Sequence, residues 1–221
     1  MVDTAFQMIQ LQGVLPMFGH ASEEVSLRML DAAYAGGARA VEFTNRSAQA
    51  QSVFRRLKKH AQNHLEGLML GAGTIITEHD AEAFCDLGAD FVVSPLVEPA
   101  VAAVCSKYGV MWCPGAATLT EMVHAQQMGA GLIKIFPAAQ LGGAAFLRAI
   151  MAPCPWLRVM PTGGVGLTKD DLQLWFAAGA RCVGIGSALF EVKDLEAGGF
   201  HIITERIRGS IEQIQNIRKN L

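Results

Sequence analysis

The chain has 221 residues, of which 51% are hydrophobic and 17% are charged, and its formal net charge is −2. This composition supports a large buried core, and the near-neutral balance gives no general attraction for nucleic acid. No apolar run approaches the ~20 residues of a membrane span, and residues 1–12 lack the basic and then apolar order of a signal peptide. We therefore predict a single domain over residues 1–221 with no nucleic-acid partner and no membrane association.

The cysteines predict a reducing environment. They are odd in number, lie far apart and form no CxxC pair, so a disulfide framework is disfavoured and a cytoplasmic location is favoured. We expect the thiols to act as small hydrophobic side chains of the core. The five residues are Cys85, Cys105, Cys113, Cys154 and Cys182.

Short apolar runs recur along the chain at spacings of about 20 to 30 residues, the pattern of buried strands separated by helices. The predicted strands cover residues 13–18, 39–44, 67–74, 91–95, 110–115, 132–138, 158–163 and 181–187. Helix start and stop signals lie between them, as where Ser22 opens an apolar-periodic stretch that ends at Gly36. Further helices are predicted in residues 47–64, 78–87, 98–108, 118–128, 168–179 and 206–221.

Eight strand–helix units whose strands are apolar on both faces predict a closed (β/α)8 TIM barrel. An open doubly wound sheet is the alternative. It is disfavoured because no GxGxxG sequence follows the first predicted strand. In a barrel the active site lies at the carboxyl ends of the strands. Polar residues and glycines collect at these ends, including Glu42, Thr44, Arg46, Thr74, Lys134, Thr162 and Ser187.

Lys134 is the most informative of these residues. It interrupts the apolar run at residues 132–138, and no acidic residue stands within several positions of it. An ammonium group buried in a strand finds a partner or loses its proton, and a neutral amine is a nucleophile for carbonyl carbon. Lys134 is thus a candidate Schiff-base lysine. The alternative is a lysine that extends to solvent or pairs with a distant carboxylate, for which Glu42 is available.

Glycine-rich turns follow the last two predicted strands, at Gly163-Gly164 and Gly186. In barrel proteins these turns often bind phosphate through backbone N–H groups. Ser187 would add a hydroxyl donor there, or would instead cap a helix. The glycines are otherwise explained as tight turns, and Arg46 as a solvated side chain at the start of a helix.

Together these residues carry a family resemblance. Seven motifs occur in order: Glu42-Phe43-Thr44-Asn45-Arg46, Gly71-Ala72-Gly73-Thr74, Ser94-Pro95, Pro114-Gly115, Lys134-Ile135-Phe136-Pro137-Ala138, Pro161-Thr162-Gly163-Gly164 and Gly186-Ser187. This set resembles the 2-dehydro-3-deoxy-6-phosphogluconate (KDPG) and 4-hydroxy-2-oxoglutarate (KHG) aldolase family, over about residues 13–189.

The resemblance implies a class I aldolase, a homotrimer that uses no metal and no cofactor and forms a Schiff base with pyruvate. Its implied substrate is a 2-keto-3-deoxy acid: KDPG, cleaved to pyruvate and glyceraldehyde 3-phosphate in Entner–Doudoroff metabolism, and also KHG, cleaved to pyruvate and glyoxylate. Lys134 is then the Schiff-base lysine and Glu42 the general acid/base. The implied substrate-binding residues are Arg46, Thr74, Pro95, Phe136, Thr162, Gly163, Gly164, Gly186 and Ser187.

Two positions depart from the family pattern. Leu96 stands where a glycine usually follows Ser94-Pro95, and Ala139 stands where a glutamate usually follows Pro137-Ala138. Both are expected near the rim of the pocket, so another 2-keto-3-deoxy sugar acid stays open as the substrate.

Other functions would account for fewer of these residues. A phosphate-binding barrel isomerase or synthase would use the glycine turns without needing Lys134. The second alternative is a catalytically silent sugar-acid sensor or scaffold. His60 and His64 have the i, i+4 spacing of a helical metal pair, but no glutamate follows His60 as HExxH requires, so a metal site is disfavoured. His20 is expected to face the opening of the barrel or to be a loop histidine.

Overall fold

The computed structural model describes residues 2–221, and every predicted apolar run in it contains a strand. The run at residues 110–115 contains one strand and the start of a second, because Pro114 has no N–H group to continue the ladder. The strands are β1 (Val14–Phe18), β2 (Ala40–Thr44), β3 (Met69–Gly73), β4 (Phe91–Val93), β5 (Met111–Cys113), β6 (Gly115–Ala116), β7 (Ile133–Ile135), β8 (Val159–Pro161) and β9 (Val183–Ile185).

The predicted helices are confirmed as α2 (Glu23–Ala35), α3 (Ala50–His64), α4 (Glu78–Asp86), α5 (Pro99–Tyr108), α6 (Leu119–Gln127), α8 (Lys169–Ala177) and α10 (Phe200–Lys219). Several begin after a side-chain cap. Thr118, for example, forms a capping box with Glu121 at the start of α6. Three helices were not predicted: α1 (Val2–Gln12), α7 (Gly143–Met151) and the short α9 (Val192–Glu196). None of the helices within residues 2–221 carries an apolar stretch long enough to span a bilayer.

All strand pairs are parallel, and they form two sheets. The six-stranded sheet has the order β5-β4-β3-β2-β1-β9, and the three-stranded sheet has the order β6-β7-β8. Pro114 alone separates β5 from β6, and a bridge between Thr162 and Gly184 connects the end of β8 to β9. The sequential order with β9 beside β1 lacks the reversal of a doubly wound sheet, so that alternative is not observed.

Side chains alternate between two cores, as the period of a strand requires. One face of the strands packs against the surrounding helices. The opposite face forms an inner core that includes Leu15, Ala40, Phe91, Val93, Met111, Cys113, Leu132, Met160 and Cys182. All five cysteines are buried, unpaired thiols, as predicted from their spacing. Lys134 lies two residues after Leu132 and Glu42 two residues after Ala40, so both belong to the inner face.

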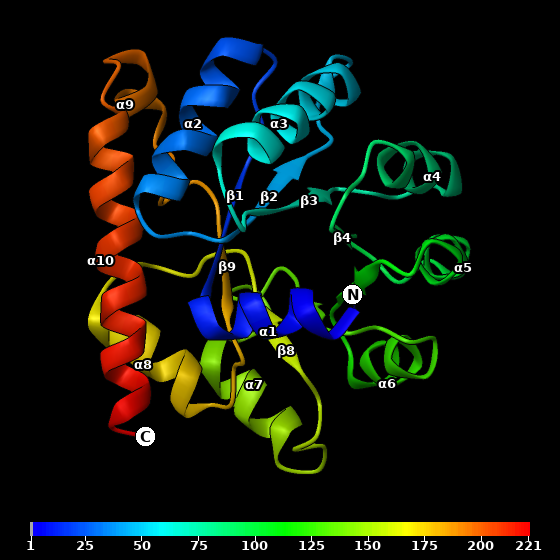
Figure 1. Cartoon of the computed structure of the whole chain (residues 1–221). Helices are drawn as coiled ribbons and strands as arrows, with labels where there is room; N and C mark the ends of the chain where they lie inside the picture. The colour runs from blue at the N-terminus through cyan, green and yellow to red at the C-terminus, as the bar shows by residue number, and fades with distance from the viewer. Residues whose placement is uncertain (1) are drawn as a thin grey trace.

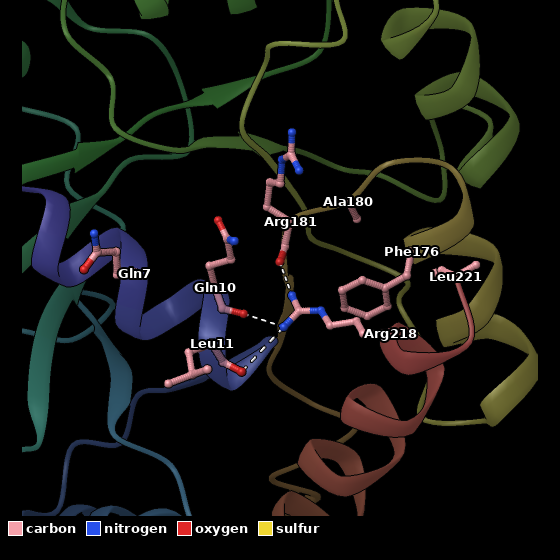
Figure 2. Close-up of a pocket in the computed structure, with 8 residues that line it drawn as sticks. All are labelled: Gln7, Gln10, Leu11, Phe176, Ala180, Arg181, Arg218 and Leu221. Atoms are coloured by element: carbon pink, nitrogen blue, oxygen red, sulfur yellow. Dashed lines mark hydrogen bonds between the residues drawn. The ribbon is translucent and has the colours of Figure 1, made fainter.

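Helix α1 closes the amino-terminal end of this inner core. It runs across the centre of the view in Figure 1, while the other long helices lie around the periphery. Its Phe6 and Ile9 pack into the inner core beneath the strands. Arg218 of α10 ties down the end of α1: its guanidinium donates to the carbonyl oxygens of Gln10, Leu11 and Arg181 (Figure 2).

Candidate active site

Lys134 lies on the inner face of β7, and its side chain is buried. Its Cα is in register with Gly115 of β6 on one side and Met160 of β8 on the other. The ammonium nitrogen lies 5.3 Å from the centre of the Phe136 ring. The structure therefore places this amine inside the fold, at the end of the strands opposite to α1, and the alternative of a side chain that extends to solvent is not observed.

Glu42 reaches the same interior from β2 and is completely buried. Among residues 2–221, neither of its carboxylate oxygens has a hydrogen-bond partner. Burial raises the pKa of the Glu42 carboxyl, and the nearby positive charges of Lys134 and Arg46 oppose that rise. A direct hydrogen-bonded ion pair between Glu42 and Lys134 is therefore not formed.

Gly73 makes the room for this carboxylate. A Cβ atom built at Gly73 would lie 1.9 Å from Oε1 of Glu42, far inside van der Waals contact. Gly73 is on β3, and its Cα is in register with Thr44 of β2. The second glycine of the Gly71-Ala72-Gly73 motif is thus explained by space for a side chain and not by a turn.

Thr74, which follows Gly73, adopts an unusual backbone conformation. Its φ is +59°, in the left-handed region that β-branched residues rarely occupy. In this position its hydroxyl accepts a hydrogen bond of 3.3 Å from Nε of Arg46. Strained residues concentrate at functional sites, where the surroundings hold them in place. The contact joins the ends of β2 and β3 and directs an otherwise exposed Arg46.

Two glycine turns, at Gly163-Gly164 and at Gly186, also belong to the site. Gly163 and Gly164 have φ values of +89° and +79°, a conformation that favours glycine. Thr162 is buried, and its hydroxyl donates to the carbonyl of Met160 at 3.4 Å. Gly184 allows this packing, because a Cβ atom there would lie 2.3 Å from Oγ1 of Thr162.

These elements enclose a cavity of about 200 Å³, which we call the lysine cavity. It brings together eight of the eleven residues predicted for the site: Arg46, Lys134, Phe136, Thr162, Gly163, Gly164, Gly186 and Ser187. Glu42 and Thr74 do not line it: Glu42 is completely buried, and Thr74 contacts the lining residue Arg46 through its hydroxyl. Pro95 does not line it; the carbonyl carbon of Pro95 instead lies 2.4 Å from where a Cβ of Gly115 would be.

The two departures from the family pattern lie in different places. Ala139 is at the glycine turn: its N–H donates to the carbonyl of Gly163 at 3.0 Å, and its Cβ would lie 2.3 Å from a Cβ on Gly164. Ala139 therefore packs behind Gly163 and Gly164, which line the lysine cavity, but it is not itself a lining residue. Leu96 is partly exposed after β4 and does not line the lysine cavity.

Met17 is a lining residue that sequence reasoning missed. It follows Leu15 by two positions on β1, so it shares the inner face, and it packs against the positions of Gly184 and Gly186. Met17 could have been identified from the alternation of inward-facing and outward-facing side chains along β1. The sequence does not display this alternation, because every residue of the strand is apolar. His20, for which a loop position and a place facing the opening were both considered, is exposed in the loop after β1 and lines a second cavity next to the lysine cavity.

Two further features lie away from Lys134. The rings of His60 and His64 are 4.9 Å apart, and Nε2 of His60 contacts Oδ1 of Asp31 at 2.6 Å. Within the described residues no group of three or more His, Cys, Asp or Glu side chains is arranged to hold a metal ion. A cavity of about 550 Å³ lies around Arg218, at the amino-terminal end of the inner core where α1 ends. None of the predicted site residues lines it (Figure 2).

The parallel α/β fold and the comparisons with known proteins define an aldolase, an enzyme of the carbon–carbon lyase class. The chain belongs to the KDPG and KHG aldolase family, whose model matches residues 6–206. The resemblance drawn from the seven motifs is therefore confirmed.

Relatives of known name align over most of the chain. It is 32% identical to the 2-dehydro-3-deoxy-phosphogluconate aldolase of Treponema pallidum, over 91% of this chain and 93% of that protein. It is also 32% identical to the KHG/KDPG aldolase of Escherichia coli K12, with 90% and 91% covered. A KDPG aldolase structure from Legionella pneumophila superposes with a TM-score of 0.84 at 27% identity, covering 93% of this chain and 97% of that one. That protein holds pyruvate captured at low pH as a covalent carbinolamine intermediate.

Proposed function

We propose that this protein is a class I aldolase that cleaves KDPG to pyruvate and glyceraldehyde 3-phosphate, and KHG to pyruvate and glyoxylate. The observation that carries the proposal is the position of Lys134. Its side chain is buried, has no hydrogen bond with the Glu42 carboxylate or with any other carboxylate of the described residues, and lines a cavity that two glycine turns also line. The Legionella relative, which captures pyruvate covalently, supports the same reaction.

Lys134 begins the reaction as a nucleophile. Its amine attacks the C2 ketone of the substrate, and loss of water gives an iminium ion. The C3–C4 bond then breaks, and its electron pair moves into the iminium to form an enamine while the aldehyde leaves. Protonation of the enamine at C3 and hydrolysis release pyruvate and restore the lysine. The iminium thus serves as the electron sink.

Glu42 moves protons at two stages. The carboxylic acid relays protons during loss of water from the carbinolamine, and its conjugate base takes the proton of the C4 hydroxyl as the aldehyde departs. A pKa raised by burial brings the carboxyl nearer to the pH at which one group can serve as both acid and base. Its unpartnered oxygens are free to accept or give these protons, directly or through one water.

Arg46 and Thr74 bind the carboxylate of the keto acid. A guanidinium group matches a carboxylate with two parallel donors, and the hydrogen bond to Thr74 restricts the rotation of Arg46 before substrate arrives. Phe136 walls the cavity beside the amine. Pro95 was also predicted to wall the pocket. Because it does not line the lysine cavity, we propose that it supports the site from a greater distance.

The distal end of the substrate is assigned to the glycine turns. Backbone N–H groups of Gly163 and Gly164, with Gly186 and the hydroxyl of Ser187, form the phosphate-binding side of the cavity. All four residues line the lysine cavity together with Thr162. With Ala139 in place of the usual glutamate beside this turn, another 2-keto-3-deoxy sugar acid is the alternative substrate.

We extend the proposal to the whole molecule. The two sheets form one closed (β/α)8 barrel, supported by the Pro114 junction and the Thr162–Gly184 bridge, and residues 1–221 form one domain. A homotrimer is proposed from the family resemblance. A cytoplasmic location is proposed from the five unpaired thiols.

Borohydride trapping tests the central claim. Reduction of the wild type in the presence of pyruvate should add the mass of a reduced pyruvate adduct at Lys134, located by peptide mass spectrometry. Lys134→Arg keeps the charge but cannot form the imine, so it should show neither adduct nor pyruvate release from KDPG or KHG. Circular dichroism verifies that the variant is folded. Pyruvate release by Lys134→Arg at a rate near that of wild type would overturn the Schiff-base assignment.

A further inference from the structure

A second cavity, of about 370 Å³, adjoins the lysine cavity, and we call it the side cavity. The two have four lining residues in common: Met17, Arg46, Gly186 and Ser187. They are therefore adjoining cavities, with the side chains of Met17, Arg46 and Ser187 at the boundary between them. The proposed cleavage of KDPG, with its phosphate on the glycine turns, leaves the side cavity without a use.

The chemistry of the side cavity differs from that of the lysine cavity. Six apolar side chains from β1, α2 and the segment after β9 line it: Met17, Phe18, Met29, Phe190, Val192 and Leu195. His20, Thr44, Arg46 and Ser187 stand among them. Nδ1 of His20 accepts a hydrogen bond of 3.0 Å from the N–H of Ser22, so the proton of the neutral ring is on Nε2.

The apolar wall is held firmly. The ring of Phe190 packs against that of Phe18 with centroids 5.2 Å apart. Arg206 of α10 donates to the carboxylate of the buried Asp194 in α9 at 2.7 Å and to the carbonyl of Leu189 at 3.2 Å. A wall fixed in this way is already shaped before a ligand arrives, which reduces the entropy lost on binding.

We propose that the side cavity binds the substituent of an apolar aldehyde, so that the enzyme also cleaves and forms 4-hydroxy-2-oxo acids that carry an aryl or branched alkyl group at C4. This inference rests on the proposed function, because it uses the same lysine. The space is sufficient, since a cavity of roughly 150 Å³ lined by apolar side chains accommodates benzene. Transfer of a phenyl group from water into such surroundings favours binding.

The reaction balances as it does for KDPG. In 4-hydroxy-2-oxo-4-phenylbutanoate the C3–C4 bond breaks, its electron pair passes to the iminium on Lys134, and the C4 hydroxyl proton passes to Glu42. Benzaldehyde leaves, and C3 gains a proton before hydrolysis releases pyruvate. The reverse reaction adds the pyruvate enamine to benzaldehyde. Neither direction needs an oxidant or a reductant.

The test measures pyruvate release from 4-hydroxy-2-oxo-4-phenylbutanoate and from KHG by the full-length protein. We expect the wild type to cleave both substrates. Val192→Asp places a carboxylate in the apolar wall at a side chain that is 66% exposed, so the fold should tolerate it. It should lower kcat/KM for the phenyl substrate, relative to that for KHG, by about tenfold or more.

Leu174→Asp is the matched control. Leu174 is also an exposed apolar residue, on α8, and it lines neither cavity. This variant should leave the ratio of the two kcat/KM values unchanged. Borohydride trapping with pyruvate on each variant verifies that Lys134 remains reactive.

The outcomes separate the two claims. If the wild type traps pyruvate and cleaves KHG but does not cleave the phenyl substrate, the inference is overturned and the proposed function stands. Equal effects of Val192→Asp and Leu174→Asp on the ratio would also overturn it. Absence of both trapping and KHG cleavage would overturn the proposed function, and the inference with it.

Discussion

Gln12 and Glu42 are both buried polar residues, but they lie at opposite ends of the inner core and differ in their hydrogen bonds. Gln12, where β1 and β2 begin, donates to the carbonyls of Val14 and Ala40 and accepts from the N–H groups of Arg39 and Ala40. Glu42, farther along β2, has no partner for either carboxylate oxygen among residues 2–221.

The difference separates a structural end of the molecule from a reactive end. A buried amide with all of its partners stabilises the fold, whereas a buried carboxyl without partners destabilises it. Backbone strain follows the same division: Thr74, with φ of +59°, lies near Glu42, while α1 closes the other end with regular helix and apolar packing. The fold is thus locally destabilised at the end where we propose the chemistry, around Glu42 and Thr74, and stabilised at the end that contains Gln12 and α1.

The largest expected effect tests the reactive end. Glu42→Gln keeps the shape of the side chain but removes its ability to exchange a proton. We expect kcat for pyruvate release from KDPG to fall by ~10²-fold or more, the usual scale for a positioned general acid/base. Some borohydride trapping should remain, because the amine of Lys134 is intact. Full activity across neutral pH would show that Glu42 has no part in proton transfer.

Gly73→Ala tests whether catalysis depends on the position of the Glu42 carboxyl. The new methyl group would fall 1.9 Å from Oε1 of Glu42 and must displace it. We expect kcat to fall by about tenfold or more, since misplacement of a catalytic group by about 1 Å costs up to ~10²-fold. The pH profile of kcat should shift as well, because a displaced carboxyl has different solvation.

Gly209→Ala is the control for this substitution. A Cβ at Gly209 meets nothing within 4 Å, and the residue lies inside α10. It should raise stability by about 0.5–1 kcal/mol, the usual gain for Gly→Ala in a helix, and leave kcat and its pH profile unchanged. Equal kinetics for the two variants would contradict the positioning role of Gly73.

The sequence predicted the regular parts of the fold well. Runs of apolar residues marked every strand, and capping residues such as Thr118 marked helix starts, because both signals are local. Helix α1 was missed because its apolar residues, Phe6 and Ile9, face an inner core that exists only after the strands assemble. The division of the predicted strand at residues 110–115 into β5 and β6 was also missed. It arises because Pro114 has no backbone N–H group to donate, and a search for apolar runs does not test for hydrogen-bond donors.

For the site, residue types were predictable and spatial relations were not. Lys134 stood out because a charge in an apolar strand is rare, and the glycine turns stood out by composition. The sequence left open whether Glu42 pairs with Lys134, since that depends on distances across the interior between β2 and β7. The same holds for Gly73, whose role is visible only against the Glu42 side chain, and for the side cavity.

The structural end is tested by Gln12→Leu. This change removes the side-chain partners of four backbone groups, two N–H and two C=O, in a buried place. We expect the free energy of unfolding to fall by about 1 to 3 kcal/mol, with kcat unchanged. Urea denaturation measures the first and the pyruvate assay the second. Gln215→Leu, at an exposed position of α10, should change neither, and a loss of kcat in Gln12→Leu without loss of stability would break the comparison.

The smallest effect is the pH dependence that Glu42 confers on stability. Burial raises the pKa of its carboxyl above the ordinary value of 4.5. As pH rises past 4.5, the unfolded chain loses this proton first and the folded protein keeps it, so unfolding releases a proton and the wild type loses stability until the raised pKa is passed. Glu42→Gln has no such proton. Its Tm should therefore gain on that of wild type as pH rises from 4.5 toward neutral.

Glu121→Gln gives the opposite sign and serves as the control. Hydrogen bonds from the N–H of Ala117 and from Thr118 lower the pKa of the Glu121 carboxyl, so its ionised form stabilises the folded state above the ordinary pKa and that contribution is lost on acidification. This variant should lose Tm relative to wild type as pH rises toward 4.5, and the difference should then stay constant up to neutral pH. If Glu42→Gln behaved in the same way, Glu42 would be ionised in the folded protein, and its role would be that of a counter-ion to Lys134.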